Sequence, residues 1–269
     1  MKKRGLKMNR DQVNEQLRNV TRDWLNSDSV QKRLKSTEGL YSDVFVPGIS
    51  EYYAEAVGRR ILLFGQEARN FYFDNDNSLE RIQDWVICYA MSQIDQTRMI
   101  SAGQDSQDLP REKLNKSPFW SLFRKIVQQG WHPAWSNLDK FHRFEPESRK
   151  TIPLTGDDEV IFNSPVRKDE KTLVQKEIEI VKPDVIVFLV GPNYTKSLSI
   201  ALRIEKKQLA AIRPTANAEG YCVRIDESLT KLSVPVYWTY HPAYILRSKK
   251  KGMSLDDLVE HIISGAKVE

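Results

Sequence analysis

The chain has 269 residues, 40% of them hydrophobic and 10% aromatic, a composition typical of globular proteins rather than of disordered or fibrous ones. No apolar run approaches the roughly 18 residues of a membrane span, and residues 1–20 lack a signal peptide's apolar stretch. We therefore expect an intracellular, cytoplasmic protein with no membrane partner. The two cysteines, Cys88 and Cys222, show no CxxC spacing, which argues against a disulfide framework and against a cysteine-built zinc or iron–sulfur site.

The formal net charge is +5, and its distribution along the chain is uneven. Residues 1–40 hold ten lysines and arginines against five acidic residues, so this stretch accounts for the whole excess. Its apolar residues recur at mostly helical spacing up to Pro47 and Gly48. We interpret residues 1–50 as a basic helical extension whose charges are solvated, with a nucleic-acid-binding arm as the alternative, and residues 51–269 as the main domain.

Beyond the extension, short apolar runs alternate with helical patterns. The helical pattern of 79–91 places Ile82, Trp85, Val86 and Tyr89 on one face. The run "DVIVFLVG" has no alternation, which is typical of a strand buried on both faces. Strands that alternate with helices indicate an α/β fold, a three-layer αβα sandwich around a central, mainly parallel four-stranded sheet. The predicted strands are 59–65, 135–138, 184–191 and 233–240, and the predicted helices are 79–91, 117–130, 172–183, 193–203 and one from Ser254 onward.

Polar residues follow the predicted strands where ligands collect in parallel sheets, at the carboxyl ends. Gln66 and Glu67 follow the first strand, Asn137 ends the second, and His241 follows the fourth. Taken one at a time, each residue has a structural interpretation: Glu67 is a capping or salt-bridging acid, Asn137 is a turn residue and His241 is a loop histidine. Together, a carboxylate that activates water, an amide that reads a base edge and an imidazole that stabilises negative charge suit hydrolysis of an N-glycosidic bond. The other histidines show no metal-ligand spacing, so we expect no metal and no cofactor.

Several motifs resemble the uracil-DNA glycosylase superfamily, particularly its bacterial and archaeal iron–sulfur branch. "TYHPAYILR" at 239–247 is nearly that branch's second motif, "SNLDKF" is similar to its "TNVVKC", and "GQEARN" is similar to the GQDPYH of the ordinary enzymes. The resemblance covers roughly residues 59–250 and implies a DNA glycosylase that flips a base out of the helix in base excision repair. It implies that Glu67 positions water or stabilises the sugar cation, that Gln66 and Asn137 bind the base, and that His241 stabilises the base anion.

The resemblance also implies DNA contacts. Ile245 and Leu246 stand where the family wedges a side chain into the duplex, and Phe73 is the expected stacking platform among three consecutive aromatic residues. The neighbouring cations are expected to meet phosphates, with a solvated basic loop as the alternative. These cations are Arg247, Lys249, Lys250 and Lys251.

The chain departs from the family at three places. Glu67 replaces an aspartate, Ala68-Arg69 replaces the Pro-Tyr that crowds the C5 position of the pyrimidine, and Phe141 stands where the branch has a cluster cysteine. We therefore expect a pocket that is more permissive at C5 and a fold without an iron–sulfur cluster.

Three functions remain open. The first is a monofunctional DNA glycosylase, expected to be a monomer, that acts on uracil or a related modified base in single- or double-stranded DNA. The second is a catalytically inactive member that binds DNA or a base. The third is an unrelated α/β enzyme for a free nucleotide, which is disfavoured because no P-loop or GxGxxG occurs.

Overall fold

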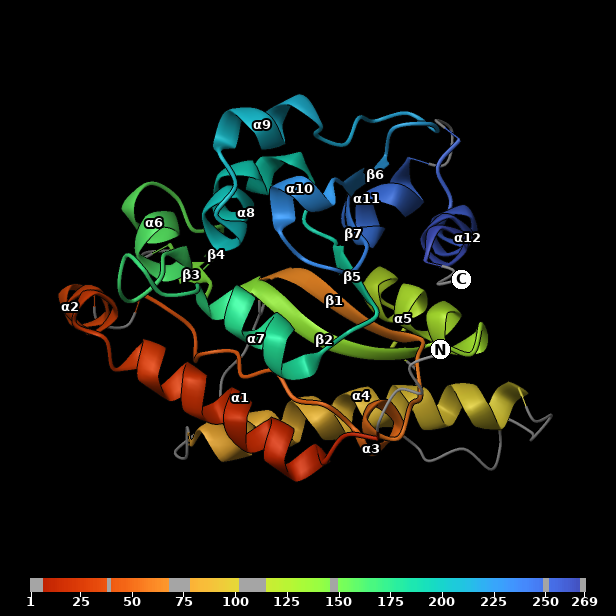
Figure 1. The fold of residues 1–269 in the computed structure, drawn as a ribbon, viewed down its shortest axis with the longest axis horizontal. Helices are drawn as coiled ribbons and strands as arrows, with labels where there is room; N and C mark the ends of the chain where they lie inside the picture. Colours follow the sequence, from red (N-terminus) through yellow and green to blue (C-terminus); the bar gives the residue numbers. More distant parts are fainter. Residues whose placement is uncertain are drawn as a thin grey trace.

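The protein is shown in Figure 1 as a computed structural model. The structure describes residues 7–37, 40–67, 78–101, 115–145, 150–248 and 252–266, and for Glu67, Ile100 and Ser101 it describes the backbone alone.

The centre of the fold is a mixed sheet of five strands in the order β2-β1-β5-β7-β6. The first four strands run parallel to one another, and β6 runs antiparallel to β7. The prediction of a mainly parallel sheet flanked by helices is confirmed, but the predicted sheet lacked β6. This four-residue edge strand pairs with β7, and its two central residues are half-buried and exposed, so it offers no continuous apolar run. The strands are β1 (Arg60–Glu67), β2 (His132–Asp139), β5 (Val185–Phe188), β6 (Cys222–Ile225) and β7 (Val236–Thr239).

Helices surround the sheet (Figure 1). The segment between β2 and the helix predicted at 172–183 also contains a helix, α6, and a two-stranded sheet of β3 (Arg143–Phe144) and β4 (Thr151–Ile152). The helices are α1 (Arg10–Leu25), α2 (Asp28–Ser36), α3 (Glu51–Ala54), α4 (Leu79–Ser101), α5 (Pro118–Gln128), α6 (Asp157–Asn163), α7 (Leu173–Val181), α8 (Thr195–Leu202), α9 (Lys206–Ala211), α10 (Glu227–Thr230), α11 (Pro242–Arg247) and α12 (Leu255–Gly265), with a 3₁₀ turn, η1 (Pro192–Tyr194).

Local capping explains where several helices begin. The Thr172 hydroxyl accepts from the Gln175 backbone N–H, and the Gln175 side chain accepts from the Thr172 backbone, which forms a capping box at the start of α7. Ser254, where the last helix is predicted to begin, caps α12 by accepting from the Asp257 N–H. These side chains satisfy N–H groups that have no partner within the helix.

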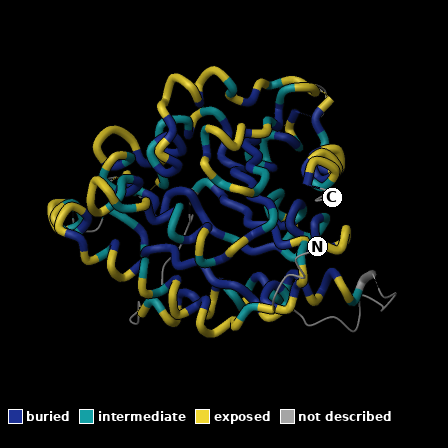
Figure 2. Tube along the Cα trace, in the orientation of Figure 1, coloured by how far each residue is buried: buried dark blue, intermediate teal, exposed yellow. Residues whose placement is uncertain are grey.

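The sheet is buried on both faces, as Figure 2 shows by the dark blue of its central strands. Alternate residues of a strand point to opposite faces, so Leu62 and Phe64 enter one core cluster with residues of α1, α7 and α8. Ile61 and Leu63 enter a second cluster with residues of α5 and α12. This explains the continuous apolar runs of the parallel strands.

The N-terminal helix α1 packs on the same core. Val13 and Leu17 belong to the cluster of α7 and α8, and the buried Asn14 amide exchanges two hydrogen bonds with the Ile49 backbone, of 3.0 and 2.8 Å. The domain division at residue 50 stays a prediction. In the described part of the chain, no helix combines the length and the apolar character needed to cross a membrane.

A buried ion pair ties the end of β2 to α7. The Lys140 ammonium donates to Glu177 Oε2 at 2.8 Å, to the Ser136 hydroxyl at 2.7 Å and to the Asn137 carbonyl at 2.7 Å. Both charged side chains are almost completely enclosed, with 2% and 1% of their surface exposed. Burial lowers the pKa of the Lys140 ammonium and raises the pKa of the Glu177 carboxyl, because each loses hydration. The attraction between the opposite charges and the three hydrogen bonds of Lys140 therefore have to offset this loss of hydration.

We expect Lys140→Met to lower the free energy of unfolding by about 3–5 kcal/mol, because it leaves the Glu177 carboxylate buried without a partner. The double variant Lys140→Met/Glu177→Met should recover much of this loss. Urea unfolding measures both. As a control, Arg224→Met breaks an exposed pair with Glu227 and should cost less than about 1 kcal/mol. An equal loss in the single and double variants would contradict this account.

Candidate functional site

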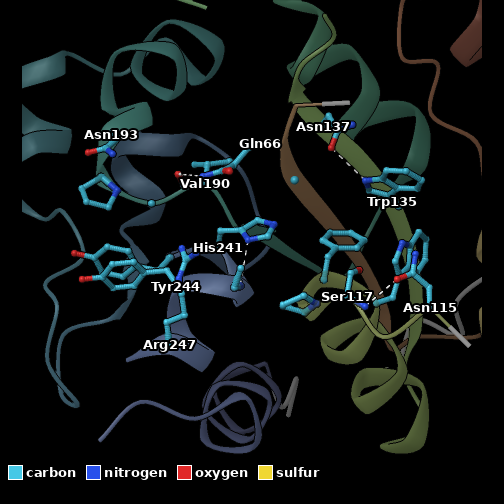
Figure 3. Close-up of a pocket in the computed structure, with 18 of the residues that line it drawn as sticks. Gln66, Asn115, Ser117, Trp135, Asn137, Val190, Asn193, His241, Tyr244 and Arg247 are labelled. Atoms are coloured by element: carbon cyan, nitrogen blue, oxygen red, sulfur yellow. Dashed lines mark hydrogen bonds between the residues drawn. The ribbon is translucent and has the colours of Figure 1, made fainter. Parts of the chain in front are cut away.

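A cavity of about 980 Å³ opens at the carboxyl ends of the parallel strands (Figure 3). Four of the sequence-predicted site residues line it together: Gln66, Asn137, His241 and Arg247. Figure 3 shows Asn137 on one side of the cavity and His241 and Arg247 on the other. The amide and the imidazole thus face a common space, although they are far apart in sequence.

Asn137 is held from three directions at the end of β2. It pairs in register with Gly65 of β1, and only 2% of its surface is exposed. Its Oδ1 accepts from Trp135 Nε1 at 3.2 Å, and its backbone carbonyl accepts from Lys140. Its buried Nδ2 has no hydrogen-bond partner in the part of the chain that the structure describes. A buried amide with spare donors is costly unless something else binds it, so this group is suited to receive a polar ligand.

Gly65 provides the room for that amide. A Cβ at this position would lie 2.5 Å from Asn137 Oδ1, closer than side chains tolerate. The glycine of the GQE segment is therefore explained by close approach to the neighbouring strand rather than by an unusual backbone angle.

His241 stands between β7 and α11. Its Nδ1 accepts a hydrogen bond from the Ala243 backbone N–H at 3.2 Å. A backbone N–H can only donate, so Nδ1 carries no proton in this arrangement and the neutral ring carries its proton on Nε2. An Nε2–H donor in a cavity can bind an oxygen that gains negative charge.

The remaining residues at the strand ends differ in how much the structure describes. Gln66 lines the cavity and donates from Nε2 to the Val190 carbonyl at 3.2 Å. Glu67 is the last residue of β1 and pairs with Asp139, but its side chain lies outside the described part. The contacts predicted for Phe73, Lys249, Lys250 and Lys251 fall on residues outside the described ranges.

The structure of α11 differs from the prediction that Ile245 and Leu246 wedge into the duplex. Ile245 is fully buried in the core cluster of α5 and α12, and Leu246 is half-buried against the same cluster. Ile245 is therefore not available to a duplex in this conformation. Tyr244 and Arg247 line the cavity instead. Residues three apart share one face of a helix, so the spacing from His241 was the signal for these two residues.

Aromatic rings make up much of the cavity wall. The helical face predicted for 79–91 is split, since Ile82 and Val86 are buried whereas Trp85 is 41% exposed. The rings form contacts at centroid separations between 4.4 and 5.6 Å, which are favourable for aromatic packing. The rings that line the cavity are Trp85, Tyr89, Phe119, Trp120, Trp135, Tyr240 and Tyr244.

Half-buried polar groups also pack at the cavity. The Arg124 guanidinium donates to the Asn115 carbonyl at 2.8 Å and to Gln93 Oε1 at 2.9 Å, and burial lowers its pKa. Burial also raises the pKa of the Tyr240 hydroxyl, which donates to the Pro214 carbonyl at 3.3 Å. Within the described ranges, no three His, Cys, Asp or Glu side chains gather into a set that could hold a metal ion. The described groups therefore offer hydrogen bonding and ring stacking to a planar, polar ligand.

Comparison with models of protein families and with curated proteins finds no match to this chain.

Proposed function

We propose that the protein is a monofunctional DNA glycosylase that hydrolyses the N-glycosidic bond of uracil or a related modified base. The observation that carries the proposal is the shared cavity of the Asn137 amide and the His241 imidazole at the carboxyl ends of a parallel sheet. The motifs at 65–70, 136–141 and 239–247 that resemble the uracil-DNA glycosylase superfamily contribute these same residues. Two core clusters on opposite faces of the sheet support the three-layer arrangement of that superfamily.

The chemistry assigns one task to each group. The target base leaves the helix and enters the cavity, where the Asn137 amide binds its polar edge and aromatic rings cover its faces. As the bond between C1′ and the base nitrogen breaks, its electron pair moves onto the base, and the Nε2–H of His241 donates to the oxygen that gains charge. Water adds to C1′ and loses a proton to the carboxylate of Glu67, which later releases it to solvent, and the base anion takes a proton from solvent water as it leaves.

DNA would approach over α11. Tyr244 and Arg247 line the cavity together with His241. The Tyr244 ring, rather than Ile245, would then fill the gap that the flipped base leaves in the base stack. The Arg247 guanidinium would contact a phosphate. Partial stacking with Tyr240, at a centroid distance of 4.4 Å, holds the Tyr244 ring in place.

The alternative is a member of the same superfamily that binds a base or DNA without hydrolysis. In this alternative, Asn137 still binds the base, but Glu67 has no catalytic role. The two functions therefore differ in their response to substitution of Glu67.

We expect His241→Ala and Glu67→Gln each to lower base release by roughly 100-fold or more, the scale of a positioned electrostatic or acid–base group. Release is measured with single- and double-stranded oligonucleotides that carry uracil, thymine, 5-hydroxymethyluracil, hypoxanthine or a modified cytosine, followed by alkaline cleavage. His261→Ala and Glu260→Gln are matched controls, because both residues are exposed on α12 away from the cavity. No release from any substrate, with salt-dependent DNA binding intact, would favour the inactive binder.

We expect Gly65→Ala to lower base release on the order of 100-fold, because the added methyl group displaces the Asn137 amide and such misplacement is costly. In an Asn137→Ala background, the same substitution should have no further effect, since Oδ1 is gone. Residual release rates of the four proteins test this. An equal effect of Gly65→Ala in both backgrounds would show that it acts elsewhere.

We expect Arg247→Ala to weaken DNA binding to a similar degree for all sequences and to reduce the salt dependence by about one phosphate contact. Fluorescence anisotropy over a range of salt concentrations measures both quantities. Lys206→Ala removes an exposed cation from α9 that does not line the cavity and should leave the salt slope unchanged. If the affinity of Arg247→Ala and that of the unmodified protein depend on salt concentration with the same slope, Arg247 does not contact a phosphate.

A further inference from the structure

Trp135 is placed so that its indole N–H can point in one direction only. The residue lies in β2, in register with Leu63 of β1. Its ring packs against Phe45 at 4.8 Å, Trp120 at 5.1 Å and Phe119 at 5.6 Å between centroids. Packing on several sides leaves the ring little freedom to turn, so Nε1 is aimed at Asn137 Oδ1, 3.2 Å away.

This hydrogen bond distinguishes the two ends of the Asn137 amide. An indole N–H is a donor only, so it can face the amide oxygen but not the amide nitrogen. Rotating the amide by half a turn would break the bond and bring the NH₂ group against the indole N–H. Lys140 holds the adjacent carbonyl, and Gly65 leaves space for the oxygen where it stands. The order of acceptor and donor presented by Asn137 is therefore fixed before any ligand arrives.

A fixed order of donor and acceptor is what separates two classes of nucleobase. Uracil, 5-substituted uracils and hypoxanthine present a lactam edge, a ring N–H beside a carbonyl oxygen, whereas cytosine and adenine present a ring nitrogen beside an amine. An amide reads the first edge in one orientation and the second edge in the other. An amide that rotates freely would accept both.

We propose that Trp135 is a positioning residue that locks the Asn137 amide in one orientation and so restricts the site to bases with a lactam edge. The inference rests on the proposed function, because it assigns a role at the same cavity. Trp135 acts through Asn137 and need not touch the base.

The test compares Trp135→Phe with Trp85→Phe. Both substitutions remove an indole N–H from a ring that lines the cavity, but only Trp135 bonds to Asn137. Two quantities are measured with oligonucleotides that differ only in uracil or cytosine at one position. These are the ratio of base-release rates, and the ratio of equilibrium affinities for protein that also carries Glu67→Gln, which needs no hydrolysis.

Trp135→Phe should lower the preference for uracil over cytosine by about 10-fold or more, the scale of one bidentate base contact. Trp85→Phe, at a ring that stacks on Tyr89, should leave this ratio unchanged, whatever it does to the overall rate. In an Asn137→Ala background, Trp135→Phe should not change the ratio further, which separates a role through Asn137 from a general structural one. If Trp135→Phe does not fold, benzothienylalanine at position 135 alone removes the N–H and keeps the shape of the ring.

The outcomes separate this inference from the proposed function. An unchanged ratio in a Trp135→Phe protein that releases uracil would overturn the inference and leave the glycosylase in place. A shifted affinity ratio in a protein that releases no base would overturn hydrolysis and support the role of Trp135. A shift that persists in the Asn137→Ala background would also overturn the inference, because Trp135 would then act by another route.

Discussion

The buried contact between Lys140 and Glu177 is the constraint on which the end of β2, and with it the site, depends. An ammonium with 2% exposure must place all three of its protons, and here they go to Glu177, Ser136 and the Asn137 carbonyl. The hydrogen bond to the Asn137 carbonyl fixes the backbone of Asn137, whose side chain lines the cavity. A buried pair of this kind contributes little net stability, but losing one partner is expensive. Its value is therefore geometric: it holds β2 to α7 at the point where Asn137 must be placed accurately.

The other side of the cavity is built by a second set of backbone constraints. Gly191 follows β5 with a positive φ of 70°, and its N–H donates to the Thr239 carbonyl at 2.9 Å while its carbonyl accepts from Trp238 Nε1 at 3.2 Å. These bonds join the ends of β5 and β7, and His241 follows directly. The donor and acceptor residues of the cavity thus come from rigid strand ends rather than from long loops. Such placement favours chemistry that requires preorganised hydrogen bonds, as departure of a base anion does.

The helix α11 combines two demands in a short segment. One face carries His241, Tyr244 and Arg247 toward the cavity, and the other buries Ile245 in the core. Burial of Ile245 anchors the helix, so that the cavity face keeps its direction relative to the sheet. The helix α4 has the same two kinds of residue: Ile82 and Val86 pack into the core, while Trp85 and Tyr89 line the cavity. In both helices the apolar character of a residue does not decide which side it occupies.

Local patterns in the sequence were sufficient for the parallel strands, for the cap at Ser254 and for the gathering of Gln66, Asn137 and His241 at strand ends, because periodicity and strand direction are properties of neighbouring residues. They did not reveal β6, a four-residue edge strand that forms by pairing with β7. Nor did they reveal that Lys140 meets Glu177, 37 residues away, or that Ile245 turns inward while Trp85 turns outward. These placements depend on which surfaces the folded chain brings together. The hydrophobic effect is non-directional, so the sequence of an apolar segment does not specify which other segment will cover it. The bond between Trp135 and Asn137 joins residues two apart, yet its direction depends on rings from other parts of the chain.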